Sequence, residues 1–161
     1  MHGTIVIEEL KAHDIQAVKA LIQEYIEWMN IDMSFQDIEE ELAGFPRKYE
    51  PPSGVFLVAK DGDQVVGCVG IKKIGDGICE MKRLFVKDTY RGEKIGYALV
   101  ERIILEAERK RYSKMRLDTL RRMKSAINLY IKSGFHEIGQ YVVNPIEDAI
   151  FMERDLCCKD T

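Results

Sequence analysis

The sequence predicts a single α/β domain over residues 1–161, in which a central mixed β-sheet carries helices on both faces. Three observations support this fold class. Short β-branched segments alternate with segments whose apolar residues recur every three or four positions. An Asp-Gly turn joins two strands as a hairpin, which indicates antiparallel pairing. Strand–helix–strand units in the second half require a crossover connection, which indicates parallel pairing.

The first third of the chain is predicted to form a strand and two helices. Residues 4–8, TIVIE, are short and β-branched, as is typical of a strand. Asp14 precedes an apolar stripe at helical spacing, so we expect it to cap a helix that runs to about Asn30. Ser34 is expected to cap a second helix, which Gly44 ends.

The middle of the chain is predicted to form the antiparallel part of the sheet. Residues 45–54 hold three of the four prolines and are interpreted as a loop. Residues 55–74 form the hairpin, and residues 78–86 add a further strand. In that last strand the apolar residues change parity, which indicates either two buried faces or a β-bulge near Lys82 and Arg83. A bulge would splay the next strand away and open a gap for an extended ligand.

The last part of the chain is predicted to alternate helices with strands. A long helix is expected from about residue 94 to 110, because four apolar residues in it are spaced by four. A glycine at the end of LYIKSG is a natural helix stop. The remaining expected elements are a strand at 114–120, a helix at 123–134, and strands at 135–141 and 149–156.

Charge and composition exclude several classes of function. A net charge of −3 argues against a nucleic-acid partner. No apolar run approaches the roughly 18–20 residues that span a membrane, and the N-terminus lacks the apolar core of a signal peptide. We therefore expect a cytoplasmic protein without a membrane partner. The four cysteines form no C-x-x-C pair and the three histidines do not cluster, so we expect reduced structural cysteines and no metal site.

Residues 90–100, YRGEKIGYALV, place a basic, glycine-containing turn before the long helix. The first N–H groups of a helix have no partner within it and carry a partial positive charge. Such a turn can direct these donors at a phosphate, with Arg91 adding a charge and Gly96 letting the backbone approach closely. An ordinary helix start is the alternative. Lys94 replaces a glycine of tighter loops, but we expect helical φ and ψ there, which do not require glycine.

These parts, together with the later segment LYIKSGF, resemble the GNAT superfamily of N-acyltransferases, which use acetyl-CoA. The resemblance covers most of the chain and is densest from Cys79 to Phe135. Residues 91–96 align with the family signature R/Q-x-x-G-x-G/A, with Lys94 in place of the middle glycine. LYIKSGF resembles the family segment LYxxxGF. The resemblance implies a GNAT-like fold with a splayed, bulged strand at the cofactor site, and it extends to many bacterial proteins of unassigned substrate.

The resemblance also implies acetyl-CoA as the acyl-donor cosubstrate and indicates its contacts. The end of the strand at 78–86 should offer backbone groups to the pantetheine and the thioester carbonyl. Backbone N–H groups of the turn should hold the pyrophosphate, and the asparagine before LYIKSGF should contact the pantetheine arm. These residues are Leu84, Phe85, Val86, Arg91, Gly92, Glu93, Lys94, Ile95, Gly96, Tyr97 and Asn128.

Tyr130 is the general acid that the resemblance implies. A tyrosine with an ordinary pKa near ~10 is protonated at neutral pH and can donate to a leaving thiolate. Glu80 is the candidate base that takes the proton of the attacking amine, directly or through water; a surface or salt-bridged carboxylate is the alternative. Direct transfer needs no acyl-enzyme, so Cys79 is not expected to act as a nucleophile. Asp118 is interpreted as a structural residue of its strand.

In this family the first two helices, their connection and the last hairpin shape the acceptor site. Arg83 is a candidate for binding an acceptor carboxylate, because its guanidinium fork suits that geometry. Tyr141 and Asn144 lie in a loop before Pro145 and are candidates to close over a small polar substrate. The expected function is therefore acetyl transfer to the primary amine of a small molecule or amino acid.

Two other functions remain open. One is transfer to a protein N-terminus or lysine, and the other is a non-catalytic acyl-CoA sensor. A homodimer that pairs through an exposed C-terminal strand is a candidate assembly. The sequence neither names the acceptor amine nor distinguishes an acetyl donor from a longer acyl donor.

Overall fold

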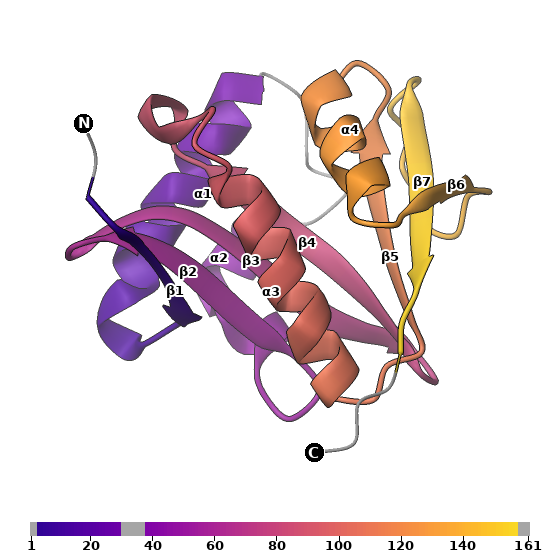
Figure 1. Cartoon of the computed structure of the whole chain (residues 1–161), viewed down its shortest axis with the longest axis horizontal. Helices are drawn as coiled ribbons and strands as arrows, with labels where there is room; N and C mark the ends of the chain where they lie inside the picture. Colours follow the sequence, from indigo (N-terminus) through magenta and orange to yellow (C-terminus); the bar gives the residue numbers. More distant parts are fainter. Residues whose placement is uncertain (1–2, 30–37, 158–161) are drawn as a thin grey trace.

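The computed structural model describes residues 3–29 and 38–157 (Figure 1). Within these residues one sheet holds seven strands, in the order β1-β2-β3-β4-β5-β7-β6. The predicted mixed sheet and the predicted order of strands and helices are confirmed. The elements are β1 Ile5–Glu9, α1 Ile15–Met29, α2 Ile38–Gly44, β2 Val55–Asp61, β3 Gln64–Gly75, β4 Ile78–Val86, α3 Ile95–Arg109, β5 Lys114–Leu120, α4 Lys124–Lys132, β6 His136–Ile138 and β7 Ala149–Asp155, with short 3-10 turns at Ala12–Asp14, Arg47–Tyr49 and Asp88–Tyr90.

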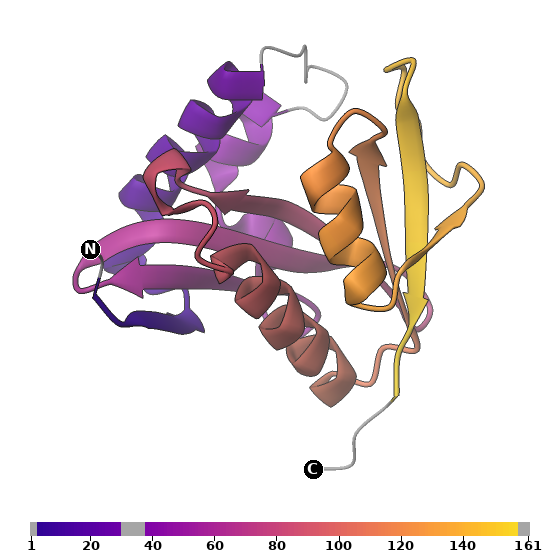
Figure 2. The ribbon, with the colours of Figure 1, turned by 45° about the horizontal axis from the view of Figure 1, so that its top comes forward.

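Helices cover both faces of the sheet, as Figure 2 shows. Strand β2 illustrates how the sequence builds the two faces, because its successive side chains point in opposite directions. Leu57 and Ala59 join the apolar cluster that contains the buried residues of α3, whereas Phe56 and Val58 join the cluster that contains those of α1. Residues of α4 pack against the α3 cluster. The sheet is therefore a shared wall between two apolar layers.

The sheet opens between β4 and β5. Their parallel pairing joins only Ile78–Glu80 to Lys114–Arg116, near the start of each strand. On its other side β4 has one extra residue relative to β3 between Lys82 and Phe85. Arg83 lies in that stretch with a φ of 61°. The predicted bulge is therefore present, and it lies just beyond the last residue that pairs β4 with β5.

A buried ion pair holds the bulge. Arg83 donates from Nε to Oε2 of Glu41 at 2.8 Å and from Nη2 to Oε1 at 3.0 Å. Tyr49 donates its hydroxyl to the same carboxylate at 3.0 Å. Burial raises the pKa of Glu41, but the Arg83 guanidinium outweighs burial and holds the pKa below its ordinary value. Because Glu41 belongs to α2, this pair ties α2 to the bulge.

Some predictions about the first helices are corrected or fall outside the described residues. Asp14 does not cap α1; it lies in the preceding 3-10 turn and accepts the backbone N–H of Lys11 at 3.1 Å. Its carboxylate also pairs with the ammonium of Lys60 at 2.8 Å. Ser34, the predicted cap of the second helix, lies outside the described residues.

The C-terminal strand is not an exposed edge, contrary to the prediction. β7 pairs with β5 on one side and with β6 on the other, so β1 and β6 are the edge strands. The homodimer predicted through an exposed C-terminal strand therefore loses its structural basis. β6 is shorter than the predicted strand, because only His136–Ile138 pair with β7. In residues 3–29 and 38–157, no helix is long and apolar enough to cross a membrane.

We predict that Glu41→Ala destabilises the protein by about 3–5 kcal/mol, because it leaves the buried Arg83 guanidinium without this carboxylate. Glu40→Ala is the matched control, since Glu40 is exposed on the same helix, and it should change the free energy of unfolding by less than about 0.5 kcal/mol. Urea denaturation followed by circular dichroism measures both values. Equal stability of the two variants would contradict the role of the ion pair.

Candidate functional site

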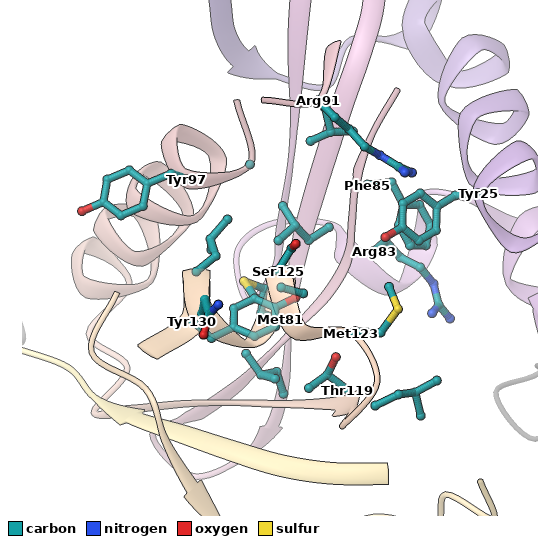
Figure 3. A pocket seen from close by; sticks show the side chains of 18 of the residues that line it. Tyr25, Met81, Arg83, Phe85, Arg91, Tyr97, Thr119, Met123, Ser125 and Tyr130 are labelled. Carbon is teal, nitrogen blue, oxygen red and sulfur yellow. The ribbon is translucent and has the colours of Figure 1, made fainter. Parts of the chain in front are cut away.

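A cavity of about 950 Å³ lies where β4 and β5 separate (Figure 3). The bulged half of β4, the end of β5, the start of α3 and one side of α4 line it, and Tyr25 and Met29 of α1 complete the wall. Most of the predicted site residues meet here: Arg83, Leu84, Phe85, Val86, Arg91, Gly92, Lys94, Ile95, Gly96, Tyr97, Asn128, Tyr130 and Asn144. Glu80, Glu93 and Tyr141 do not belong to the lining.

The turn before α3 corrects the expectation for Lys94. Lys94 is the N-cap of α3 and has a left-handed backbone, with φ 63° and ψ 20°. Residues that have a Cβ rarely adopt this backbone conformation, so glycine would be favoured at this position. The Lys94 carbonyl accepts the N–H of Ala98 at 3.1 Å. The N–H groups that precede Ala98 therefore belong to the first turn of α3, which has no intrahelical acceptors for them.

Gly96 lines the cavity and permits a close approach to a neighbouring helix. A Cβ at this position would lie 3.2 Å from Cδ1 of Leu129 and 3.8 Å from Cγ2 of Val86. The glycine therefore lets the first turn of α3 pack against α4 and the end of β4. This contact brings the helix terminus and the helix that carries Tyr130 to the same cavity.

Arg91 turns its side chain toward α1. Its guanidinium lies 4.2 Å from the ring centroid of Trp28 and 5.6 Å from that of Tyr25, and it pairs with Asp88 at 3.1 Å. Figure 3 shows the side chain extending toward Tyr25. The backbone N–H of Arg91 donates to the carbonyl of Asp88. The N–H of Arg91 is therefore satisfied within the turn, and its side chain bridges the turn and α1.

Tyr130 reaches the cavity from α4. Its side chain is buried and packs edge-on against Phe135, with ring centroids 5.9 Å apart. Burial, with smaller contributions from Tyr25 and Asp118, raises the pKa of Tyr130 well above its ordinary value. The phenol is therefore protonated at neutral pH and can act as a donor toward a group in the cavity.

Glu80 and Tyr141 form a pair with each other. The Tyr141 hydroxyl donates to Glu80 at 2.7 Å, and the ammonium groups of Lys72 and Lys82 lie 3.8 and 4.0 Å from the same carboxylate. Glu80 is only 3% exposed. Burial and the neighbouring carboxylate raise the pKa of Tyr141. The salt-bridged alternative for Glu80 therefore describes its surroundings better than a base that faces the cavity.

Asp118 is a cavity residue that the sequence reasoning assigned to structure alone. Its carboxylate accepts a hydrogen bond from Nδ2 of Asn144 at 3.0 Å, and both residues line the cavity. Asn144 in turn accepts the N–H of Ile146 at 3.1 Å, which fixes its orientation. One signal in the sequence pointed here: Asp118 lies near the carboxyl end of a strand parallel to β4, where α/β sheets bind ligands.

The acceptor role predicted for Arg83 does not fit the structure. Its guanidinium is 4% exposed, and Glu41 already occupies the fork in a two-point contact. Cys79 also stays apart from the chemistry: it is fully buried, and burial raises the pKa of its thiol to about 12. No cluster of metal-ligating side chains occurs within the described ranges.

A helix N-terminus and a protonated tyrosine thus face the same gap between two parallel strands. The sequence model of the family described as acetyltransferase (GNAT) domain matches residues 52–137, slightly more than half of the chain. The chain therefore belongs to the GNAT acetyltransferase family, and the protein is an acyltransferase.

Relatives and solved structures agree with this assignment. The chain is 41% identical over 145 residues to an uncharacterized N-acetyltransferase of Schizosaccharomyces pombe. The aligned region covers 89% of each protein. The fold of this chain is similar to that of a GNAT-family acetyltransferase from Staphylococcus aureus. The TM-score is 0.80 and the identity 24%, and the match covers 95% of this chain and 99% of that one. A PaiA N-acetyltransferase from Thermoplasma acidophilum, solved in complex with coenzyme A, matches with a TM-score of 0.77, 21% identity and the same coverage.

We predict that Lys94→Gly is more stable than Lys94→Ala by about 1 kcal/mol, because only glycine adopts the left-handed backbone without a Cβ clash. Both variants lose the ammonium group, so the comparison isolates the backbone. Thermal and urea denaturation of the two variants measure the difference. An alanine variant as stable as the glycine variant would show that the left-handed turn carries no strain.

Proposed function

We propose that this acyltransferase moves an acetyl group from acetyl-CoA to the primary amine of a small molecule or amino acid. One observation carries the proposal: a single cavity joins the N-terminus of α3, the bulged end of β4 and the Tyr130 side chain. These are the three groups that a CoA thioester needs for its pyrophosphate, its pantetheine arm and its sulfur.

The charges around the cavity fit a CoA thioester. Lys94 at the start of α3 and Lys132 on α4 are cations of the lining, and the helix terminus adds its partial positive charge. Asp118 is the one carboxylate among the described lining residues. Phosphate groups are therefore favoured near α3. Leu84, Phe85 and Val86, at the end of β4, would run beside the pantetheine, and Asn128 would contact that arm from α4.

The reaction needs one new bond and one broken bond. The amine nitrogen attacks the thioester carbonyl carbon, the carbon–sulfur bond breaks, and the net transfer moves one proton from nitrogen to sulfur. Tyr130 donates its hydroxyl proton toward the departing sulfur, and the base that takes the proton of the amine returns a proton to Tyr130 directly or through water. Because the pKa of Tyr130 is raised, a lasting tyrosinate is disfavoured and the two transfers are coupled. Acyl-CoA supplies the activated acyl group when it is bound.

Asp118 is the better candidate than Glu80 for the proton of the amine. Asp118 lines the cavity and is held by Asn144, whereas Glu80 lies outside the lining and is held by Tyr141. A carboxylate in the cavity attracts an ammonium and accepts its proton directly or through water. In this proposal Glu80 has a positioning role: it binds Tyr141 and so holds the loop that carries Asn144.

Isothermal calorimetry with acetyl-CoA, combined with a thiol-release assay over an amine panel, tests the proposal.

We predict that Tyr130→Phe binds acetyl-CoA as the wild type does but turns over about 10²–10⁴-fold more slowly, because it lacks the proton donor. The wild-type rate should show no loss up to about pH 10 from ionisation of Tyr130, since its pKa lies above that range. Absence of acetyl-CoA binding would exclude the proposed function. Binding without turnover of any amine would favour a sensor, and turnover of peptide amines alone would favour a protein acetyltransferase.

We predict a different outcome for the two candidate bases. Asp118→Asn should lower kcat/KM for the amine about 10²-fold or more and leave acetyl-CoA binding intact. Glu80→Gln keeps a hydrogen-bond acceptor for Tyr141 and should change kcat/KM by less than about tenfold. Steady-state kinetics with both variants and their pH profiles separate the two roles. A larger loss in the Glu80 variant would return the base role to that residue.

A further inference from the structure

The cavity has two chemically different ends. The lining includes Lys94 at the N-terminus of α3 and the polar residues Ser125 and Asn128 of α4. Figure 3 shows Tyr97 on one side of the cavity and Tyr25, Phe85 and Met123 toward the other, where the Arg83 and Arg91 side chains also extend. We call the side that holds Tyr25 the second end; the lining also includes Met29, Leu120 and Ile146. With the donor bound along β4 and α3, this second end is left for the acceptor.

The acceptor end carries several apolar side chains, and the Arg91 guanidinium lies 5.6 Å from the Tyr25 ring centroid. The ring of Tyr25 stacks on Phe85, with centroids 4.1 Å apart and planes at 15°. Burial raises the pKa of Tyr25, so its phenol is uncharged at neutral pH. Met29 and Met123 are half-buried in the same wall, and their flexible thioethers adapt to apolar groups of different shape. A polar acceptor body would lose hydration against the two methionines without gaining a hydrogen bond from them, and the Tyr25 hydroxyl offers it one polar partner.

The charges limit the acceptor further. Asp118, the one carboxylate of the described lining, offers a partner for one ammonium group. The described lining residues offer no second carboxylate to another ammonium on the same acceptor. Each extra charge of a polyamine or an aminoglycoside would therefore be desolvated without a carboxylate partner from these residues.

We infer that the acceptor is a monoamine with an apolar body, either aromatic or branched aliphatic. This inference rests on the proposed function, because it assumes that the other end of the cavity holds the acyl donor. It replaces the small polar substrate expected from the loop that carries Tyr141 and Asn144. In the structure the Tyr141 side chain binds Glu80 and the Asn144 side chain binds Asp118, so both are already engaged by carboxylates.

An amine panel at saturating acetyl-CoA tests the inference. Values of kcat/KM for 2-phenylethylamine and isoamylamine should exceed those for ethanolamine and putrescine by about tenfold or more. A comparison of kcat/KM for L-phenylalanine and for 2-phenylethylamine distinguishes an amino acid acceptor from a simple amine. A preference for either compound supports the inference, because both have one amine and an aromatic body. If acetyl-CoA binds but ethanolamine or putrescine reacts equally well, or no apolar amine reacts, the inference is overturned while donor binding stands. Failure to bind acetyl-CoA would instead overturn the proposed function.

A pair of variants on α4 and its N-cap locates the preference in the cavity wall. Met123 is the N-cap residue of α4, and its side chain makes no capping hydrogen bond, so Met123→Gln removes no cap. This variant should reduce the preference for apolar amines by a factor on the order of 3–10. Ile131→Gln makes the same chemical change on the exposed side of α4 and should keep the preference. An equal effect of both variants, or none in Met123→Gln, would overturn the assignment of this wall.

Discussion

The separation of β4 from β5 depends on one backbone distortion, the bulge at Arg83. An extra residue with a left-handed backbone is unfavourable for a side chain as large as arginine, so the surroundings must hold it. The two-point contact with Glu41 does so, and it satisfies the buried guanidinium at the same time. Because β4 bends here, its last residues face a cavity instead of continuing the ladder with β5. The cavity is therefore present because the second half of β4 does not pair with β5.

A second constraint joins the two helices that face this gap. Gly96 lets the first turn of α3 lie against Leu129 of α4, one residue before Tyr130. A side chain at Gly96 would have to displace that contact. The donors at the helix terminus and the phenol on α4 consequently reach one cavity from two elements far apart in sequence. Arg91 extends the arrangement to α1 through its contacts with Trp28 and Tyr25, so the turn is fixed on both sides.

Local patterns in the sequence predicted much of this fold. The parity change in β4 predicted the bulge, and the strands at 78–86 and 114–120 match the structure residue for residue. The turn and LYIKSGF predicted which residues line one cavity. The errors concern side-chain partners, which depend on residues distant in the chain. Arg83 lines the cavity, but its guanidinium pairs with Glu41 of α2 and is not open to a substrate. Glu80 pairs with Tyr141 and lies outside the lining. The left-handed backbone at Lys94 was also missed, although the family signature has a glycine at this position, the residue that adopts a positive φ most readily.

A crystal structure of the protein with coenzyme A tests the central claim most directly. The account predicts pyrophosphate at the free N–H groups of the first turn of α3 and pantetheine beside Leu84, Phe85 and Val86. The sulfur should lie within hydrogen-bond distance of the Tyr130 hydroxyl, at about 3–3.5 Å. Coenzyme A bound outside the gap between β4 and β5, or with its sulfur remote from Tyr130, would contradict the account.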